Sequence, residues 1–170
     1  MKANMKNGLE PIIDKNSKIL ILGSLPGDQS ILNQKYYDNK VNHFWKLLSF
    51  VFENKFIDFN DYAEKIIFLK KHNIALWDVI KCANRDGSLD SNIVNEEYND
   101  IKSLLDNSNI KSIYVNGRKA ESSFKKYLKL NAFKIDYKYL PSSSSLNAKY
   151  NVNAKALEWQ NVILNSKEVL

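Results

Sequence analysis

Cysteine, histidine and long apolar runs are scarce in this chain of 170 residues. The single cysteine, Cys82, excludes an internal disulfide and a metal site made of cysteines alone. Even with the two histidines, His43 and His72, it does not supply the ligands of a zinc cluster. No stretch has the apolar length of a transmembrane helix, and the polar residues 1–6 lack the core of a signal peptide. We therefore expect a cytoplasmic protein with no metal, no cofactor and no membrane association.

The composition that is present is that of a globular domain. Hydrophobic residues make up 44% of the chain and aromatic residues 12%, which favours a packed core over disorder. A chain of this length buries a sizeable core within one domain. No internal repeat or linker-like segment divides it. We therefore predict a single domain over residues 1–170, and we expect a monomer with no obligatory protein partner.

Positive charge is concentrated in the last third of the sequence. The net charge is +6, and residues 111–170 carry eleven basic and four acidic side chains. Such an excess is typical of a surface that binds a polyanion. Lysine-rich helix faces are also commonly just solvated, so charge alone favours nucleic acid only modestly.

Short apolar runs alternate with amphipathic segments along the chain. The apolar runs predict strands at residues 18–22, 74–80, 110–116 and 133–140. The amphipathic segments predict helices at 43–54, 61–72, 93–107 and 118–130, and from 147 or 151 to 165. Residues 7–17 are expected to be a surface lead-in, and 82–91 a turn-rich loop. The alternation predicts a three-layer α/β/α fold with a four-stranded parallel central sheet.

The strand at 18–22 ends at a turn that contains two glycines, Gly23 and Gly27. Turns at the carboxyl ends of parallel strands are where open α/β sheets place ligands. Glycines there let a ligand approach the backbone, and free N–H groups can bind an oxyanion. The glycine spacing is neither that of a P-loop nor that of a dinucleotide-binding turn. An ordinary strand–turn–helix corner is the alternative, in which Asp28 caps the following helix.

An asparagine precedes the helix predicted at 43–54. Apolar residues at 44, 47, 48 and 51 have helical spacing, so the helix begins near Asn42 or His43. Asn42 is therefore expected at or near the N-cap, which is one sufficient reason for an asparagine there. The alternative is that its amide hydrogen-bonds a base edge or positions a water, while the ring of Tyr37 stacks on a base.

The polar ends of the other strands are expected near this asparagine. With right-handed crossovers, the turns at Gly23, Lys81, Gly117 and Pro141 share one edge of the sheet. That placement puts Asn42, the Tyr36–Tyr37 pair and the serine-rich loop at 142–145 around one cleft. Asp78, a polar residue in the strand at 74–80, is expected either to be paired at this edge or to bond to nearby backbone.

Three segments, taken in order, resemble one enzyme family. G-S-L-P-G-D-Q-S followed by Y-Y-D-N-K-V-N-H-F-W-K-L-L resembles the first motif of the uracil-DNA glycosylase superfamily. It is most similar to the branch that removes hypoxanthine from DNA containing deoxyinosine, which has Gly-Ser-x-Pro where uracil-removing relatives carry Asn or Gln-Asp. I-A-L-W-D-V-I-K-C-A-N-R-D-G-S-L-D-S-N-I resembles the middle segment, and L-P-S-S-S-S-L-N-A resembles the second motif. The resemblance covers about residues 18–159.

The resemblance implies a uracil-DNA glycosylase-like fold and a monofunctional DNA glycosylase that hydrolyses the N-glycosidic bond of deoxyinosine. The asparagine of Asn-x-Phe-Trp, which is catalytic in that branch, aligns with Asn42. The residues implied to bind the base are Gly23, Ser24, Leu25, Pro26, Gly27 and Tyr37. Those implied to contact double-stranded DNA with a damaged base, after the nucleotide has been flipped out, are Pro141, Ser142, Ser143, Ser144, Ser145, Leu146 and Asn147, with Leu146 as a wedge.

Two alternatives remain open at the level of the sequence. The first is a uracil or mismatch-specific DNA glycosylase of the same fold, because the preference of a pocket is not read from one sequence. The second is a non-catalytic nucleic-acid-binding α/β protein, which would bind DNA with the usual salt dependence but release no base.

Overall fold

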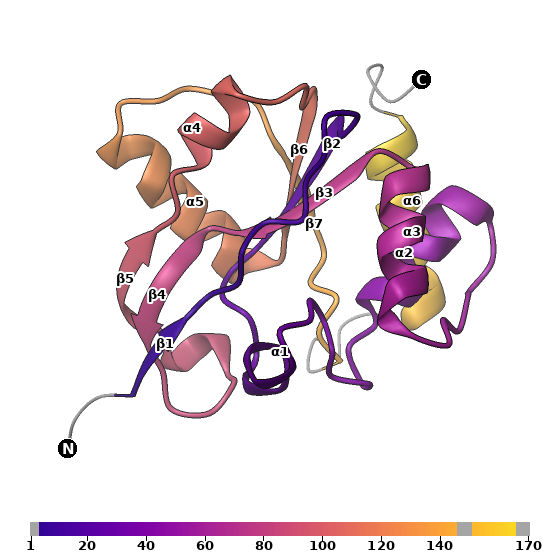
Figure 1. Ribbon diagram of the computed structural model, residues 1–170, viewed down its shortest axis with the longest axis horizontal. Coiled ribbons are helices and arrows are strands. Elements are labelled where there is room, and N and C mark those ends of the chain that lie inside the picture. The colour runs from indigo at the N-terminus through magenta and orange to yellow at the C-terminus, as the bar shows by residue number, and fades with distance from the viewer. Residues whose placement is uncertain (1–3, 146–150, 166–170) are drawn as a thin grey trace.

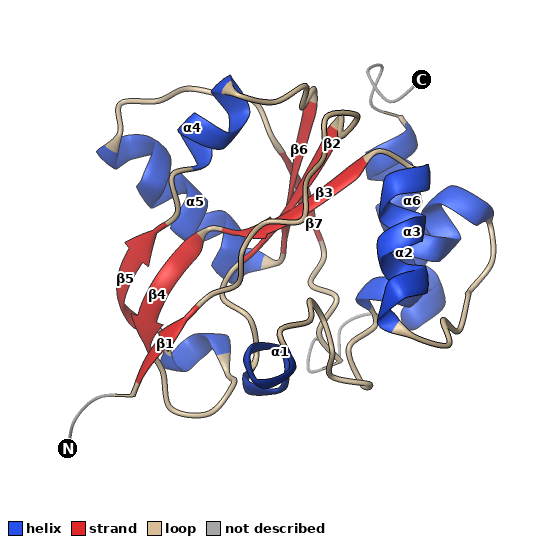
Figure 2. Ribbon diagram, in the orientation of Figure 1, coloured by secondary structure: helices blue, strands red, loops and turns tan. Residues whose placement is uncertain are grey.

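Four parallel strands form the central sheet of the computed structural model, which describes residues 4–145 and 151–165 (Figure 1, Figure 2). Across the sheet the order is β3 (Ile74–Asp78), β2 (Ile19–Gly23), β6 (Ser112–Asn116) and β7 (Lys138–Leu140). Each neighbouring pair is parallel. Every residue of β2 is buried, as expected for a strand that is covered on both faces. The predicted four-stranded parallel sheet is confirmed.

Helices cover both faces of this sheet (Figure 1). On one face lie α2 (Phe44–Glu53), α3 (Tyr62–Lys71) and α6 (Val152–Leu164), and on the other lie α4 (Ile101–Asp106) and α5 (Arg118–Leu130). Side chains alternate between the faces of a strand. Accordingly Ile19 and Ile21 join the core beneath α2 and α6, whereas Leu20 and Leu22 join the core beneath α4 and α5. The predicted three-layer architecture is confirmed.

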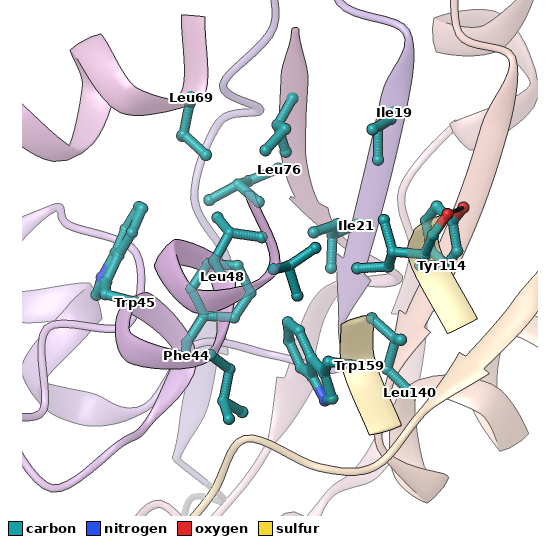
Figure 3. Packing of buried hydrophobic residues seen from close by; sticks show 14 of the residues in the cluster. Ile19, Ile21, Phe44, Trp45, Leu48, Leu69, Leu76, Tyr114, Leu140 and Trp159 are labelled. Carbon is teal, nitrogen blue, oxygen red and sulfur yellow. Dashed lines mark hydrogen bonds between the residues drawn. The ribbon is translucent and has the colours of Figure 1, made fainter. Parts of the chain in front are cut away.

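Aromatic side chains fill the layer between the sheet and helices α2 and α6 (Figure 3). The rings of Phe44 and Trp159 are fully buried and meet edge to face, with their centroids 5.7 Å apart. The indole Nε1 of Trp159 donates a hydrogen bond to the carbonyl of Pro141 at 2.8 Å. Burying one such side chain stabilises the fold by about 1.5–3 kcal/mol. This packing fixes the start of α2, and with it the preceding Asn42.

A second, antiparallel sheet adjoins the main one. It consists of β1 (Met5–Asn7), β4 (Ile80–Asn84) and β5 (Val94–Tyr98), with β4 in the middle. The sequence did not indicate this sheet: residues 7–17 were predicted as a surface lead-in, 82–91 as a loop and 93–107 as a helix. The chain continues almost directly from β3 into β4, so the apolar run predicted as one strand at residues 74–80 contributes strands to both sheets. Buried side chains of Ile80 and Ala83 form a small core with Leu25.

The helix predicted at 93–107 is wrong in its first half. A short 3₁₀ turn (Asp90–Asn92) and strand β5 precede α4, which begins only at Ile101. Val94, Tyr98, Ile101 and Leu105 have helical spacing, but pairing with β4 overrides that pattern. Asp100 ends the extended segment, since its carboxylate accepts a hydrogen bond from the N–H of Ser103 and caps α4.

Two further boundaries differ from the prediction. The strand expected at 133–140 is confined to its last three residues, because β6 pairs only with Lys138–Leu140. Gly27 rather than Asp28 is the N-cap of the short helix α1 (Asp28–Asn33), and the Asp28 side chain makes no cap hydrogen bond. Asp28 instead forms ion pairs with Lys6 and Arg85.

No helix within residues 4–145 and 151–165 has the length and apolar character required to cross a membrane. In the same described residues, no three His, Cys, Asp or Glu side chains are grouped so that they could hold a metal ion.

Candidate active site

A cavity of about 620 Å³ opens at the carboxyl ends of β2, β3 and β6. The size lies within the range of small-molecule sites. Predicted residues from three distant segments line it together: Gly23, Ser24, Leu25, Pro26, Gly27, Tyr37, Asn42, Ser142, Ser143, Ser144 and Ser145. The expected convergence of one carboxamide, one aromatic ring and one serine loop is therefore observed. Asp78 and Asn116, at the ends of β3 and β6, lie in the same lining.

The turn at residues 23–27 is held by a buried arginine that the sequence analysis assigned only to a loop. Arg85 donates from Nη1 to the carbonyl of Leu25 at 3.3 Å and from Nη2 to the carbonyl of Pro26. Its Nε donates to the carbonyl of Gly87 at 3.0 Å. The turn is thus tied to the segment that follows β4, and its backbone conformation is fixed before any ligand binds.

Side chains of the turn are also engaged. The hydroxyl of Ser24 donates to Asp90 Oδ1 at 2.8 Å. The side chain of Leu25 packs in the small core with Ile80 and Ile93. Burial raises the pKa of Asp90 above its usual range, while the hydrogen bond from Ser24 and the charge of Arg85 act in the opposite direction. The hydrogen bond between Ser24 and Asp90 therefore lies in the cavity lining, whereas Leu25 anchors the turn in the small apolar core.

Gly23 makes room for two polar side chains. A Cβ at this position would lie 2.4 Å from Asp78 Oδ1 and 3.0 Å from the Tyr37 hydroxyl. Any side chain here would collide with the carboxylate, which sits on the neighbouring strand in register with Gly23. The sequence suggested that this glycine lets a ligand approach the backbone. In the structure, the groups that lie close to Gly23 are the side chains of Asp78 and Tyr37.

Asp78 is a buried carboxyl group in the cavity wall. It is 3% exposed, and its Oδ2 has no hydrogen-bond partner among the described residues. Burial, together with the charge of Asp90, raises the pKa of Asp78 to about 7, against the opposing effect of Arg85. Its backbone carbonyl accepts a hydrogen bond from the side-chain amide of Asn99 at 2.8 Å. The expected bond to nearby backbone is therefore not made by the carboxylate Oδ2.

The ring of Tyr37 is held rigidly at the cavity. It stacks on Phe44 with centroids 3.7 Å apart and planes 6° from parallel. Its hydroxyl accepts a hydrogen bond from Asn116 Nδ2 at 3.1 Å. The backbone of Tyr37 lies in the left-handed region, with φ of 52°, a conformation that a bulky residue adopts only where its surroundings impose it. With one face on Phe44, the other face is the one available to a flat ligand.

The side-chain amide of Asn42 makes the contact expected of a residue near the N-cap of α2, which is His43. Its Oδ1 accepts a hydrogen bond from the N–H of Phe44 at 2.9 Å, so it satisfies a free donor at the start of α2. Its own N–H donates to the carbonyl of Asn39 at 2.9 Å. Among the described residues, no hydrogen bond involves its Nδ2, and Asn42 lines the cavity. The capping contact therefore sets the orientation of an amide whose NH₂ group remains for a ligand.

Asn116 connects the serine loop to the aromatic ring. Its Oδ1 accepts from the N–H of Ser143 at 2.9 Å, and its Nδ2 donates to Ser143 Oγ at 2.9 Å as well as to Tyr37. Ser143 is 1% exposed, so it anchors the loop, whereas Ser144 and Ser145 are more exposed. From the sequence, a turn at Gly117 is expected at this edge of the sheet, but no role is predicted for Asn116. Its place at the end of a parallel strand was the available signal.

Hydrogen bonds from His43, at the start of α2, and from Lys155, in α6, hold the serine loop at residues 142–145. The N–H of His43 donates to the carbonyl of Ser143 at 3.0 Å, and Nζ of the buried Lys155 donates to the carbonyl of Ser144 at 3.3 Å. Pro141 is buried and is not among the residues that line the cavity. The predicted contact residues Leu146 and Asn147 lie outside the residues that the structure describes.

Comparison with known proteins agrees with this geometry. A model of the family described as the uracil DNA glycosylase superfamily matches residues 10–165. A hypoxanthine DNA glycosylase of Methanosarcina acetivorans is 40% identical over 159 residues, 93% of this chain and 98% of that protein. One of Methanosarcina barkeri strain Fusaro is 40% identical over 143 residues, 84% of this chain and 88% of that protein.

A solution structure from Methanosarcina acetivorans, described as a putative uracil DNA glycosylase, is similar in fold as well as in sequence. It has a TM-score of 0.77 and 39% identity, and the match covers 94% of this chain and 96% of that one. The family match spans most of the chain, from before β2 to the end of α6. This chain therefore belongs to the uracil DNA glycosylase superfamily.

Proposed function

We propose that this protein is a monofunctional DNA glycosylase that hydrolyses the N-glycosidic bond of deoxyinosine and releases hypoxanthine. The observation that carries the proposal is the single cavity that Asn42, Tyr37 and the serine loop share. Relatives named hypoxanthine DNA glycosylase, 40% identical over most of both chains, support the choice of base. The volume of about 620 Å³ is sufficient for a purine.

The substrate is DNA whose damaged nucleotide has been rotated out of the stack, at a cost of a few kcal/mol. In this proposal the free face of Tyr37 stacks on the extruded base. The Nδ2 of Asn42 donates a hydrogen bond to the base or to the attacking water. Its orientation is already fixed by the contact from Phe44, so binding does not have to order this side chain.

Breaking the glycosidic bond transfers its electron pair to the departing base, and the sugar becomes cationic. Water then attacks C1′, and the products are the free base and an abasic site. In this proposal backbone N–H groups of the turn at residues 23–27 stabilise the negative charge on the base. No lysine is among the described residues that line the cavity, which favours simple hydrolysis over lyase chemistry.

The serine loop is proposed to contact the DNA backbone around the lesion. The hydroxyl groups of Ser142, Ser144 and Ser145 are suited to bind phosphates, with Ser143 and Pro141 as the buried support. Leu146 and Asn147 are proposed to complete this contact, with Leu146 as a wedge in the base stack. We extend the proposal to a monomer that acts in the cytoplasm on double-stranded DNA.

A base-release assay tests this function. Duplexes that each contain one modified base, including hypoxanthine and uracil, are incubated with the protein, and abasic sites are then cleaved with alkali. We expect release of hypoxanthine. Release of uracil alone would support the uracil-specific alternative, which the description of the Methanosarcina acetivorans structure favours. Salt-dependent DNA binding without release of any base would support the non-catalytic alternative.

Two substitutions at Asn42 separate catalysis from helix capping. In Asn42→Asp the carboxylate still accepts the hydrogen bond from Phe44 but offers no NH₂ donor, so we expect a folded protein whose rate falls about a hundredfold or more. Asn42→Ala loses both groups and should in addition lose about 1 kcal/mol of stability. Asn16→Asp, at an exposed position away from the cavity, is the matched control. Wild-type activity in Asn42→Asp contradicts the proposed role.

A further inference from the structure

The carboxyl group of Asp78 has no assigned task in the reaction described above. It is buried at the end of β3, it lines the cavity, and Gly23 on the adjacent strand leaves the space that it occupies. Its Oδ2 has no partner among the described residues. A buried polar atom without a partner costs stability. Such an atom in the wall of a ligand cavity is expected where a ligand supplies the missing partner.

Among the described residues, no charged group forms an ion pair with Asp78. The positive charge of Arg85 lowers the pKa of Asp78, but this guanidinium is committed to three backbone carbonyls and to Asp28. Asp90 opposes ionisation of Asp78, and Tyr36 and Tyr37 are kept neutral by burial, with pKa values above their usual range. The environment therefore favours the uncharged carboxyl group near neutral pH.

We propose that the neutral carboxyl group of Asp78 donates a hydrogen bond to the departing base, and that ionisation of Asp78 opposes base release. The proposal rests on the proposed glycosylase function, since it assigns a catalytic residue to that reaction. The base is the group in the cavity that gains negative charge as the bond to C1′ breaks. A carboxylic acid held neutral by an apolar site is a known means of donating a hydrogen bond to such charge.

The sign of the charge determines the effect of Asp78. When the bond breaks, the electron pair passes to the purine, whose negative charge a neutral carboxyl group stabilises through its O–H. The water that attacks C1′ gives up one proton to solvent, and the released purine takes up one proton, so the hydrolysis balances without consuming the acid. A carboxylate in the same place offers no donor and repels the departing base. Activity therefore requires the protonated form of Asp78.

The test is the pH dependence of single-turnover base release from an inosine-containing duplex. Since the pKa of Asp78 is raised to about 7, the wild-type rate should fall above this pH, by about tenfold per unit once ionisation is complete. Asp78→Asn keeps an uncharged donor, so its rate should show no such fall. Asp78→Leu has no donor, and its rate should be lower by about a hundredfold at pH 6.

Each outcome of this experiment has one meaning. Asp136→Asn, an exposed position that does not line the cavity, should reproduce the wild-type profile, and titration of the substrate should appear in every profile. The inference is overturned if Asp78→Asn keeps the fall above pH 7, or if a folded Asp78→Leu releases base at the wild-type rate. A wild-type protein that releases no base overturns the proposed function itself, so the two failures are distinguishable.

Discussion

At the scale of single residues, the site depends on small groups that determine where larger ones lie. Gly23 is the clearest case, because the position of its missing Cβ is 2.4 Å from Asp78 Oδ1. Asn42 is another, since one hydrogen bond from Phe44 fixes both the start of α2 and the direction of the amide. Such contacts order the cavity in the absence of substrate, which is the condition for electrostatic stabilisation without reorganisation.

Replacement of Gly23 by alanine should destabilise the protein. The new Cβ must displace the buried carboxyl group of Asp78 and the Tyr37 hydroxyl, and such overpacking costs about 1–3 kcal/mol. Gly27→Ala is the matched control, because a Cβ there would lie no closer than 3.7 Å to Ser88. Urea unfolding measures both variants. Equal stabilities for the two variants would show that the side chains of Asp78 and Tyr37 can move aside at little cost, contrary to this prediction.

At the scale of elements, the strand ends and the serine loop act together through Asn116. The Asn116 side chain forms hydrogen bonds with Tyr37, which lies between α1 and α2, and with Ser143, which lies in the loop after β7. These two segments are far apart in the sequence. The Asn116 amide and the hydrogen bond between His43 and Ser143 hold them in their relative position. The serine loop is therefore part of the cavity wall rather than an independent surface turn.

Asn116→Ala should weaken both substrate binding and stability. It removes three hydrogen bonds and leaves the buried Ser143 N–H without a partner, at a cost of about 2–3 kcal/mol. We expect KM for the inosine duplex to rise more than kcat falls, because in the proposed complex the loop and Tyr37 bind substrate but do not contact the breaking bond. Steady-state kinetics and urea unfolding measure the two effects. Asn131→Ala, which removes one hydrogen bond at the C-terminal end of α5, is the control, and similar kinetics in both variants would contradict this role.

Sequence patterns predicted those helices and strands in which the spacing of apolar residues matches the spacing of buried positions. The helices α2 and α5 and the buried strands β2 and β6 lie close to their predicted ranges. The pattern failed at β5, where three of the five side chains are exposed, so that pairing with β4 rather than a buried face makes the segment extended. It also failed at Arg85, whose importance depends on which carbonyls it meets in three dimensions. Such contacts have no local signature.

At the scale of the whole molecule, the predicted concentration of positive charge is partly neutralised. Lys119 and Lys126 on α5 both pair with Glu96, and Lys125 pairs with Glu121. The basic last third of the sequence is thus not a continuous free surface of positive charge along α5. Resemblance in three ordered motifs was the stronger guide to function, because motif residues converge on one cavity irrespective of the surrounding charge.

Asp78 should also make the stability of the whole molecule depend on pH. The folded protein holds the pKa of this group at about 7, whereas in an unfolded chain its pKa is about 3.9. Between these values the folded state binds more protons than the unfolded state, so the free energy of unfolding falls as pH rises, by up to about 1.4 kcal/mol per unit. Other carboxylates, such as Glu96 with its lowered pKa, act in the opposite direction. The difference between Asp78→Asn and wild type isolates Asp78: we expect the variant to gain stability relative to wild type from pH 4.5 to pH 8. Urea unfolding at a series of pH values measures this difference, and a constant difference would mean that Asp78 is ionised in the folded protein throughout.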